Sequence, residues 1–218
     1  MLSGTEPIRV VLANQHPIIR SNLRLLLERE LALKVIGEAA DGREAAALAE
    51  YRRPDIVLLD IKLPPLNGIS AAREIASQQQ SLGIIFVTVL TDEEYVSEAF
   101  KAGARGYVLG DVAPTDLFRA IHVVADGGSF LSPVISKRLI EEDFAERPAD
   151  CSLSEHQKEL CCLLAAGYRE YEILARLNSI SGSISDDRQN VIEIVQRMSL
   201  PAVIVDSIRG NHHLVEHS

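Results

Sequence analysis

The chain has 218 residues, of which 47% are hydrophobic, and a net charge of −9. This length allows one large or two small domains with real cores. Residues 1–126 hold 13 Lys or Arg and 17 Asp or Glu, and residues 127–218 hold 9 and 14. Because both halves are acidic, nonspecific attraction to nucleic acid or to an anionic membrane is disfavoured.

The first 126 residues alternate between apolar runs and segments with helical spacing. The apolar runs predict strands over residues 8–13, 33–37, 56–60, 84–88 and 106–109. The segments between and after them predict helices over residues 16–30, 43–51, 69–77, 92–102 and 114–125. This alternation predicts an α/β fold, with a doubly wound five-stranded parallel sheet and helices on both faces.

Strand signals disappear after this first domain. Residues 127–150 are predicted to be a linker, in which 132–142 suits a short helix and 143–150 a tether. The remaining predicted elements are helices over 154–166, 170–177 and 186–198, a helix or a strand over 201–209, and a frayed tail over 211–218. The second domain, 151–218, is therefore predicted to be small and all-α.

The three cysteines do not predict a disulfide framework, because the number is odd and Cys161 is adjacent to Cys162. Both are expected to be small buried hydrophobes of a helix. The sequence has no apolar run long enough to span a membrane, and residues 1–7 lack the features of a signal peptide. We therefore expect a soluble, cytoplasmic protein.

A single carboxylate, Asp60, ends the apolar run of residues 56–59 and precedes a Pro-Pro-Leu-Asn-Gly turn. A continuous apolar run predicts a strand buried on both faces. Asp60 then lies at the carboxyl edge of the sheet, where open α/β folds bind their ligands. A carboxylate there can bind a cation or act as a nucleophile. The simpler alternative is a residue at a strand end that binds only water.

These residues resemble a known family. Residues 57–68 and 101–109 resemble the receiver domain of bacterial two-component response regulators, which has the flavodoxin-like fold. Residues 153–167 and 172–177 resemble the first two helices of the LuxR-type helix-turn-helix domain of the NarL/FixJ branch. The resemblance implies a homodimeric, DNA-binding transcription regulator that acts in a phosphorelay with a sensor histidine kinase.

The resemblance also assigns roles in the receiver domain, residues 1–126. It makes Asp60 the phosphoacceptor, Thr88 the switch hydroxyl and Tyr107 the switch aromatic. From the residues alone, Thr88 is equally well explained as a β-branched strand residue. Tyr107 is expected to be a half-buried packing residue in either case.

Two charged parts of the family's site are missing. Asn14 and Gln15 stand where the family has an acidic pair, and Gly110 stands where it has a lysine. Mg²⁺ prefers oxygen ligands that include carboxylates, and loss of one electrostatic partner costs about 3–4 kcal/mol of barrier. We therefore expect no required cofactor, weak Mg²⁺ binding by Asp60 at best, and slow or absent phosphorylation. The alternative is that Asp60 and backbone carbonyls still hold a metal and accept phosphate from a dedicated kinase.

The predicted recognition helix matches the family poorly, because it opens with Asp186 and Asp187. A helix-turn-helix contacts bases with the first residues of its second helix. The residues predicted to contact DNA are Arg188, Gln189, Asn190 and Arg197. Residues 151–200 hold five Lys or Arg and seven Asp or Glu. The two aspartates can instead simply stabilise the first turn of a helix through its dipole.

The sequence thus predicts a NarL/FixJ-type transcription regulator whose receiver is controlled by a partner protein, a small ligand or its own abundance. The alternative is a phosphorylation-independent interaction module that has lost DNA binding and docks onto a histidine kinase or another regulator. An enzyme is disfavoured, because the sequence contains no nucleophile–base pair, metal-ligand spacing, Walker loop or dinucleotide fingerprint.

Overall fold

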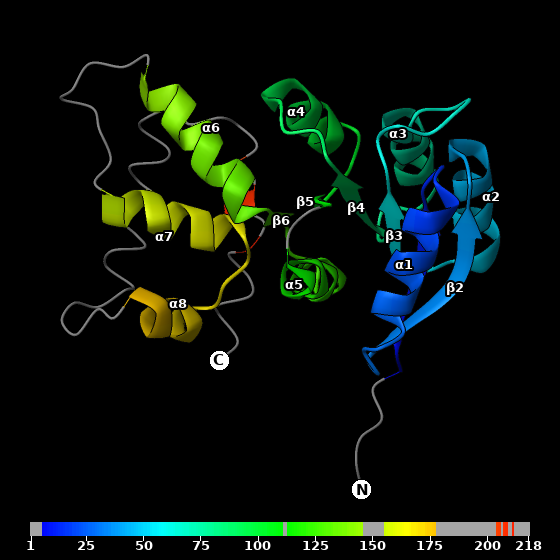
Figure 1. Cartoon of the computed structure of the whole chain (residues 1–218), viewed down its shortest axis with the longest axis horizontal. Coiled ribbons are helices and arrows are strands. Elements are labelled where there is room, and N and C mark those ends of the chain that lie inside the picture. The colour runs from blue at the N-terminus through cyan, green and yellow to red at the C-terminus, as the bar shows by residue number, and fades with distance from the viewer. Residues whose placement is uncertain are drawn as a thin grey trace, which may run out of the picture. The chain divides into compact units, whose positions relative to one another are not determined.

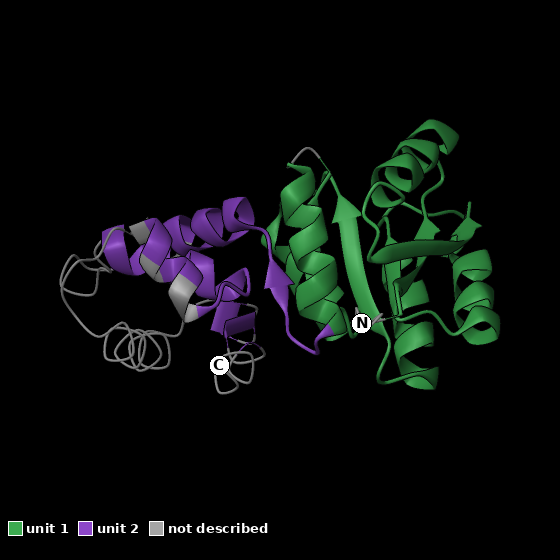
Figure 2. Cartoon of the chain, turned by 90° about the horizontal axis from the view of Figure 1, so that it is seen from below, with its two compact units in different colours: residues 1–125 green, residues 126–218 purple. Residues whose placement is uncertain are grey.

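The computed structural model describes residues 6–110, 113–145, 155–177, 204–205, 207–208 and 211. The chain divides into two compact units, residues 1–125 and 126–218 (Figure 2). Within the described residues, every helix is too short or too polar to cross a lipid bilayer.

The first unit has the predicted α/β alternation (Figure 1). Its strands are β1 (Ile8–Ala13), β2 (Leu33–Ala39), β3 (Ile56–Leu59), β4 (Gly83–Thr88) and β5 (Gly106–Leu109). Its helices are α1 (Pro17–Leu27), α2 (Gly42–Arg52), α3 (Gly68–Gln78), α4 (Glu93–Lys101) and α5 (Pro114–Ala125). The predicted bounds agree with these to within three residues at each end.

These five strands form a parallel sheet in the order β2-β1-β3-β4-β5. The chain runs outward from β1 to β2 and then crosses back to β3. Because such crossovers are right-handed, this reversal places α1 on one face of the sheet and α2 on the other. The packing of α2 against α3, and of α3 against α4, extends the second layer. The carboxyl ends of β1 and β3 are neighbours at the reversal, which is where doubly wound sheets bind ligands.

The core explains why these strands are continuously apolar. Leu12, Leu58 and Ile85 are at most 2% exposed, because helices cover both faces of the sheet. Each such side chain stabilises the fold by about 1.5–3 kcal/mol relative to an exposed one.

Side chains set the starts of the helices that flank the site. Asn67 Oδ1 accepts a hydrogen bond from the Ser70 backbone N–H at 2.8 Å, which caps α3. Helix α1 begins with Pro17, a residue suited to a first turn. His16 stands at the N-cap of α1 but is exposed and makes no side-chain cap bond.

The second unit contains β6 (Phe130–Leu131), α6 (Pro133–Ala145), α7 (Glu155–Ala165) and α8 (Glu170–Leu177). Part of the predicted 127–150 linker is therefore folded, because Ile135, Leu139 and Ile140 are buried on one side of α6, which packs against α7. The predicted helices over 154–166 and 170–177 are confirmed as α7 and α8. Cys161 and Cys162 are buried free thiols of α7, as expected.

The end of the chain differs from the predicted frayed tail at Asn211. This side chain is 5% exposed, donates to the Leu164 carbonyl at 2.9 Å and accepts from the Ser129 backbone N–H at 2.8 Å. One buried and one partly buried hydrogen bond hold Asn211 in the second unit, so fraying does not begin there. The described residues 204–205 and 207–208 are helical, which favours the helix over the strand. The predicted helix over 186–198 lies outside the described residues.

Candidate functional site

The site forms where β1 and β3 end side by side. Ala13 pairs with Leu59 in the sheet, so the next residues, Asn14 and Asp60, emerge together. The Asp60 backbone N–H donates to the Ala13 carbonyl at 2.9 Å. The Asn14 side-chain amide then donates from Nδ2 to Asp60 Oδ2 at 3.2 Å. The sheet register thus brings a predicted acidic-pair position into contact with the predicted phosphoacceptor.

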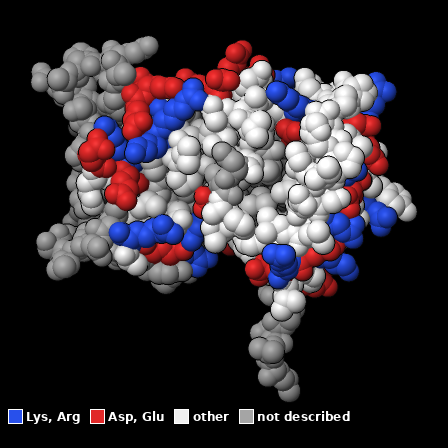
Figure 3. Space-filling model, in the orientation of Figure 1, with Lys and Arg blue, Asp and Glu red and all other residues white. Residues whose placement is uncertain are grey.

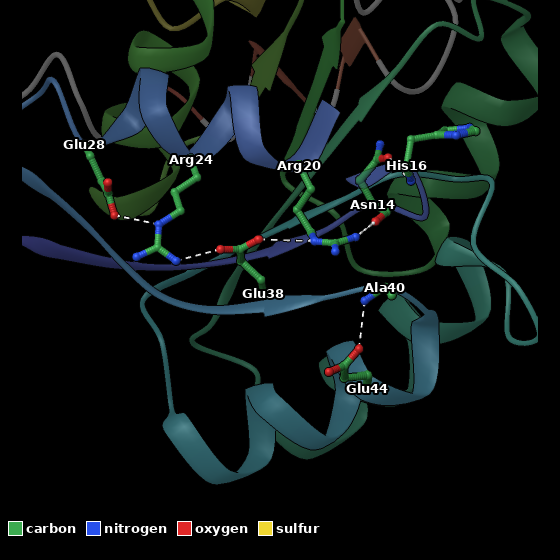
Figure 4. Close-up of polar contacts among 8 residues, drawn as sticks. All are labelled: Asn14, His16, Arg20, Arg24, Glu28, Glu38, Ala40 and Glu44. Atoms are coloured by element: carbon green, nitrogen blue, oxygen red, sulfur yellow. Dashed lines mark hydrogen bonds and ion pairs between the residues drawn. The ribbon is translucent and has the colours of Figure 1, made fainter. Parts of the chain in front are cut away.

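The direction of the Asn14 amide is fixed by its other partner. The His16 backbone N–H lies 2.8 Å from Asn14 Oδ1 and can only donate, so the amide oxygen must face it. The amide NH₂ consequently faces Asp60. Asn14 is 6% exposed, and its backbone carbonyl accepts from Arg20 Nη1 at 2.7 Å (Figure 4). A neutral donor therefore occupies the place beside the carboxylate.

An ion-pair network on α1 and β2 holds Arg20 in this position (Figure 4). Arg20 Nε lies 3.2 Å from Glu38 Oε2, and Arg24 Nη1 lies 2.6 Å from Glu38 Oε1. Arg24 also pairs with Glu28 at 2.9 Å. The hydrogen bond from Arg24, aided by Arg20, lowers the pKa of Glu38. Sequence reasoning missed Arg20, although its i,i+4 spacing with Arg24 and Glu28 marked a charged face of the helix.

The carboxyl of Asp60 is half-buried, and this burial raises its pKa. The backbone N–H groups of Lys62 and Ile61, the Thr88 hydroxyl and the charge of His16 act in the opposite direction. The Lys62 N–H lies 3.3 Å from Asp60 Oδ1, whereas the Lys62 side chain is exposed. Among the described residues, no Lys or Arg forms an ion pair with Asp60.

Gly110 leaves open space at the edge of the site. A Cβ built there would meet no atom closer than the Thr88 carbonyl oxygen at 3.8 Å. The fold therefore has room for a Cβ at this position and does not require glycine.

The two predicted switch residues meet at Leu90. Thr88, 4% exposed, accepts from the Leu90 backbone N–H at 3.4 Å, and the Tyr107 hydroxyl donates to the Leu90 carbonyl at 3.0 Å. Tyr107 was expected to be half-buried, but it is completely buried, with its ring 6.3 Å from that of Phe86. Burial raises the pKa of Tyr107, so its hydroxyl stays a donor at neutral pH. The backbone N–H and the backbone carbonyl of Leu90 are thereby both hydrogen-bonded.

Asp60 lies in a cleft of about 510 Å³ in the first unit. The cleft brings together five of the predicted site residues, which are Asn14, Gln15, Asp60, Thr88 and Gly110. Tyr107 is buried in the core and does not line the cleft. No group of three His, Cys, Asp or Glu side chains in the described part of the chain could hold a metal ion.

The predicted DNA contacts Arg188, Gln189, Asn190 and Arg197 lie outside the described residues. Helices α7 and α8 coincide with the two helices predicted over 154–166 and 170–177.

Comparison with known proteins agrees with this architecture. The family model described as the response regulator receiver domain matches residues 10–122. The uncharacterized transcriptional regulatory protein YxjL of Bacillus subtilis is 30% identical over 212 residues, which cover 94% of this chain and 97% of the relative. The nitrate/nitrite response regulator protein NarL of Escherichia coli is 30% identical over 204 residues, which cover 91% and 93%.

A similar solved structure is that of a two-component response regulator of the LuxR family from Aurantimonas, with a TM-score of 0.61 and 36% identity. The match covers 63% of this chain and 98% of that one. The chain therefore belongs to the response regulator family with a receiver domain, and its relatives are of the NarL and LuxR type.

Proposed function

We propose that this protein is a NarL/FixJ-type transcription regulator whose receiver works without ordinary phosphorylation of Asp60. The names of its relatives, among them a transcriptional regulatory protein and a nitrate/nitrite response regulator, support the regulatory role. The observation that carries the proposal about Asp60 is the hydrogen bond from the Asn14 amide to its carboxylate.

This hydrogen bond disfavours Mg²⁺ at the site. A hard cation needs several oxygen ligands and is best bound by carboxylates. Asn14 turns its oxygen toward the His16 backbone and its NH₂ group toward Asp60, so it offers a donor where a cation needs an acceptor. The residues present do not fit Mg²⁺, and Asp60 is left as the single carboxylate beside the cleft's polar end.

The missing ammonium adds to the same effect. A phosphoryl group that approaches Asp60 brings negative charge to a half-buried carboxylate. With glycine at position 110, no side chain from this position can balance that charge. Loss of one such partner typically slows a reaction by about 10²–10³-fold.

Acetyl phosphate in millimolar magnesium tests the proposal directly. The full chain and the Asp60→Asn variant are incubated with the donor, and the phosphorylated fraction is followed by intact mass. We expect the two proteins to label at the same negligible rate. Rapid labelling of the wild-type chain that Asp60→Asn abolishes would refute the proposal.

DNA binding by the second unit requires its own experiment. We propose that Arg188 and Arg197 contact DNA, because Arg binds phosphates and base edges. Gel shifts with genomic fragments, over a series of salt concentrations, should show binding that weakens with salt. Arg188→Ala and Arg197→Ala should weaken the shift, whereas the exposed Arg73 of α3 serves as a matched control in Arg73→Ala. Sedimentation of the same samples tests the proposed homodimer.

A second candidate is an interaction module that has lost DNA binding. Residues 151–200 hold seven acidic and five basic residues, and this excess of negative charge favours the interaction module. In this case no fragment shifts even at low salt, and the full chain co-elutes with a purified sensor kinase or regulator in size-exclusion chromatography.

A further inference from the structure

The walls of the Asp60 cleft are apolar. Ile19, Leu23 and Leu26 line it from α1 at the spacing of one helix face, and Val87 and Val89 line it from the end of β4. Ile19 is 46% exposed and Val89 is 72% exposed, so part of this wall faces water. The face of the first unit that carries α1 also shows a broad area without charged residues (Figure 3). Covering such side chains with an apolar molecule is favourable.

The polar groups converge at one end of the cleft, where Asn14, Asp60 and Thr88 lie. Asp60 Oδ2 accepts from Asn14 and Oδ1 from the Lys62 N–H, and the Ile61 N–H and the Thr88 hydroxyl also form hydrogen bonds with the carboxylate. All four of these donors are neutral groups, so they leave the net charge of the carboxylate uncompensated. The polar end is therefore suited to a ligand that brings a positive charge.

The half-buried carboxylate of Asp60 favours a cation in the cleft. The other ionisable lining residues are His16 and Lys62, whose side chains are exposed to water. An anion would approach the partly buried carboxylate against repulsion, whereas an ammonium group would form charge-assisted hydrogen bonds with it. With glycine at position 110, the protein provides no ammonium of its own at that edge of the cleft.

The size of the cleft, about 510 Å³, lies within the usual range for small-molecule sites. An apolar pocket with a few converging polar groups is also the usual composition of such sites. We propose that this cleft binds a small organic amine, with its ammonium group on Asp60 and its apolar body between α1 and the end of β4. The inference deepens the proposed function and rests on its claim that the cleft is not a phosphate site.

Three probes with the same apolar body separate charge from hydrophobic contact. They are n-octylamine, n-octanol and octanoate, each titrated below its aggregation concentration into the ¹⁵N-labelled full chain. We expect the amine to shift the amide signals of the cleft residues and to bind about tenfold more tightly than the alcohol, because bonds to charged groups are stronger than neutral ones. Octanoate should bind more weakly than either.

Two variants locate the ammonium group. Asp60→Asn removes the charge, so the amine should bind no more tightly than the alcohol. Gly110→Lys places an ammonium in the open space beside the cleft and should weaken amine binding at least about tenfold. Glu50→Gln, on the exposed surface of α2, is the matched control and should change neither affinity.

The inference is overturned if the three probes bind equally, if none binds at millimolar concentration, or if the shifts lie outside the cleft. It is equally overturned if both Asp60→Asn and Gly110→Lys keep the preference for the amine. Because the titration uses no phosphodonor, its failure leaves the labelling result intact. Rapid labelling of Asp60 would refute the proposed function whatever the amine does.

Discussion

Asn14 Nδ2 donates to Asp60 Oδ2 across 3.2 Å, while the backbone N–H of His16 holds the other end of the same amide. The amide thus satisfies one oxygen of the carboxylate without a net charge. A carboxylate at position 14 would instead face Asp60 as a second anion. This difference between an amide and an acid is the basis of the first prediction.

Asn14→Asp should make the free energy of unfolding depend on a divalent cation. Without magnesium, two carboxylates in contact repel each other, and we expect the free energy of unfolding to fall by about 1–3 kcal/mol. Millimolar magnesium should restore most of the loss, because the acid pair then has a cation to bind. Urea unfolding with and without magnesium measures this. The wild-type chain is the control and should respond little; an equal response of both proteins would contradict the prediction.

Restoring all three missing charges should restore phosphorylation. We expect the variant with Asn14→Asp, Gln15→Asp and Gly110→Lys to be labelled by acetyl phosphate at least about 10²-fold faster than the wild-type chain. Intact mass gives the rate. The same triple variant with Asp60→Asn must stay unlabelled, since otherwise the phosphate is on another residue.

Two glycines near the site should respond in opposite ways to the same change. A Cβ at Gly68 would collide with the Asp60 carbonyl oxygen, whereas a Cβ at Gly110 has room. Gly68→Ala should therefore lower the free energy of unfolding by on the order of 2–3 kcal/mol, and Gly110→Ala should change it by less than about 0.5 kcal/mol. Urea unfolding of the two variants side by side tests the geometry of the turn after β3. Equal effects would contradict it.

The Tyr107 hydroxyl should stabilise the segment that follows β4. Tyr107→Phe keeps the buried ring but removes the donor to the Leu90 carbonyl, so we expect a loss of about 1 kcal/mol. Hydrogen exchange should become faster at Leu90 and its neighbours, while the amides of β1 change little. Tyr51→Phe is the control, because Tyr51 is 83% exposed. Unchanged exchange at Leu90 would show that the hydrogen bond does not hold the segment.

The pKa values of two carboxyls of the receiver should be shifted in opposite directions. The pKa of Asp60 is raised by burial, whereas the pKa of Glu38 is lowered by its hydrogen bonds to Arg24 and Arg20. Carboxyl ¹³C titration should place Asp60 above and Glu38 below the ordinary range. The reverse order of the two would contradict this electrostatic picture.

The same shifts predict how stability changes with pH. Because the pKa of Glu38 is lowered in the folded state, this residue stabilises the fold at pH values above its pKa in the unfolded chain. That stabilisation is lost as the pH falls through the pKa of Glu38 in the folded state. Glu38→Gln should therefore cost about 0.5–1 kcal/mol at neutral pH, a small value because the pair is partly exposed, and nothing in strong acid. For Asp60 the sign is opposite, since ionisation in the fold is disfavoured and stability falls as pH rises through its folded pKa. Glu50→Gln is the control for both.

Much of the receiver could be predicted from sequence, because its strands are continuous apolar runs and its helices carry a clear period. The position of Asp60 followed from the end of its strand, and those of Asn14 and Gly110 followed from the resemblance to the receiver family. The direction of the Asn14 amide could not be predicted, because it depends on the backbone N–H of His16. A backbone N–H is present whatever the side chain, so the sequence does not mark it as a partner. Arg20 was missed since its bond to the Asn14 carbonyl is likewise a backbone contact.

The second unit was harder for a related reason. The burial of Asn211 depends on Ser129 and Leu164, which are 82 and 47 residues away in the chain. Local composition at the end of the chain is polar and resembles a free tail. Long-range backbone partners of this kind leave no periodic trace in the sequence.

The two hydrogen bonds of the Leu90 backbone set a minimum free-energy cost for any conformational change that displaces this residue. Its N–H is bound by Thr88 and its carbonyl by Tyr107, so displacing it breaks two hydrogen bonds together. That costs about 2 kcal/mol. An effector must then bind the displaced form about thirtyfold more tightly than the undisplaced form to displace Leu90 in half of the receiver molecules. An effector with a smaller preference leaves most receivers in the undisplaced form.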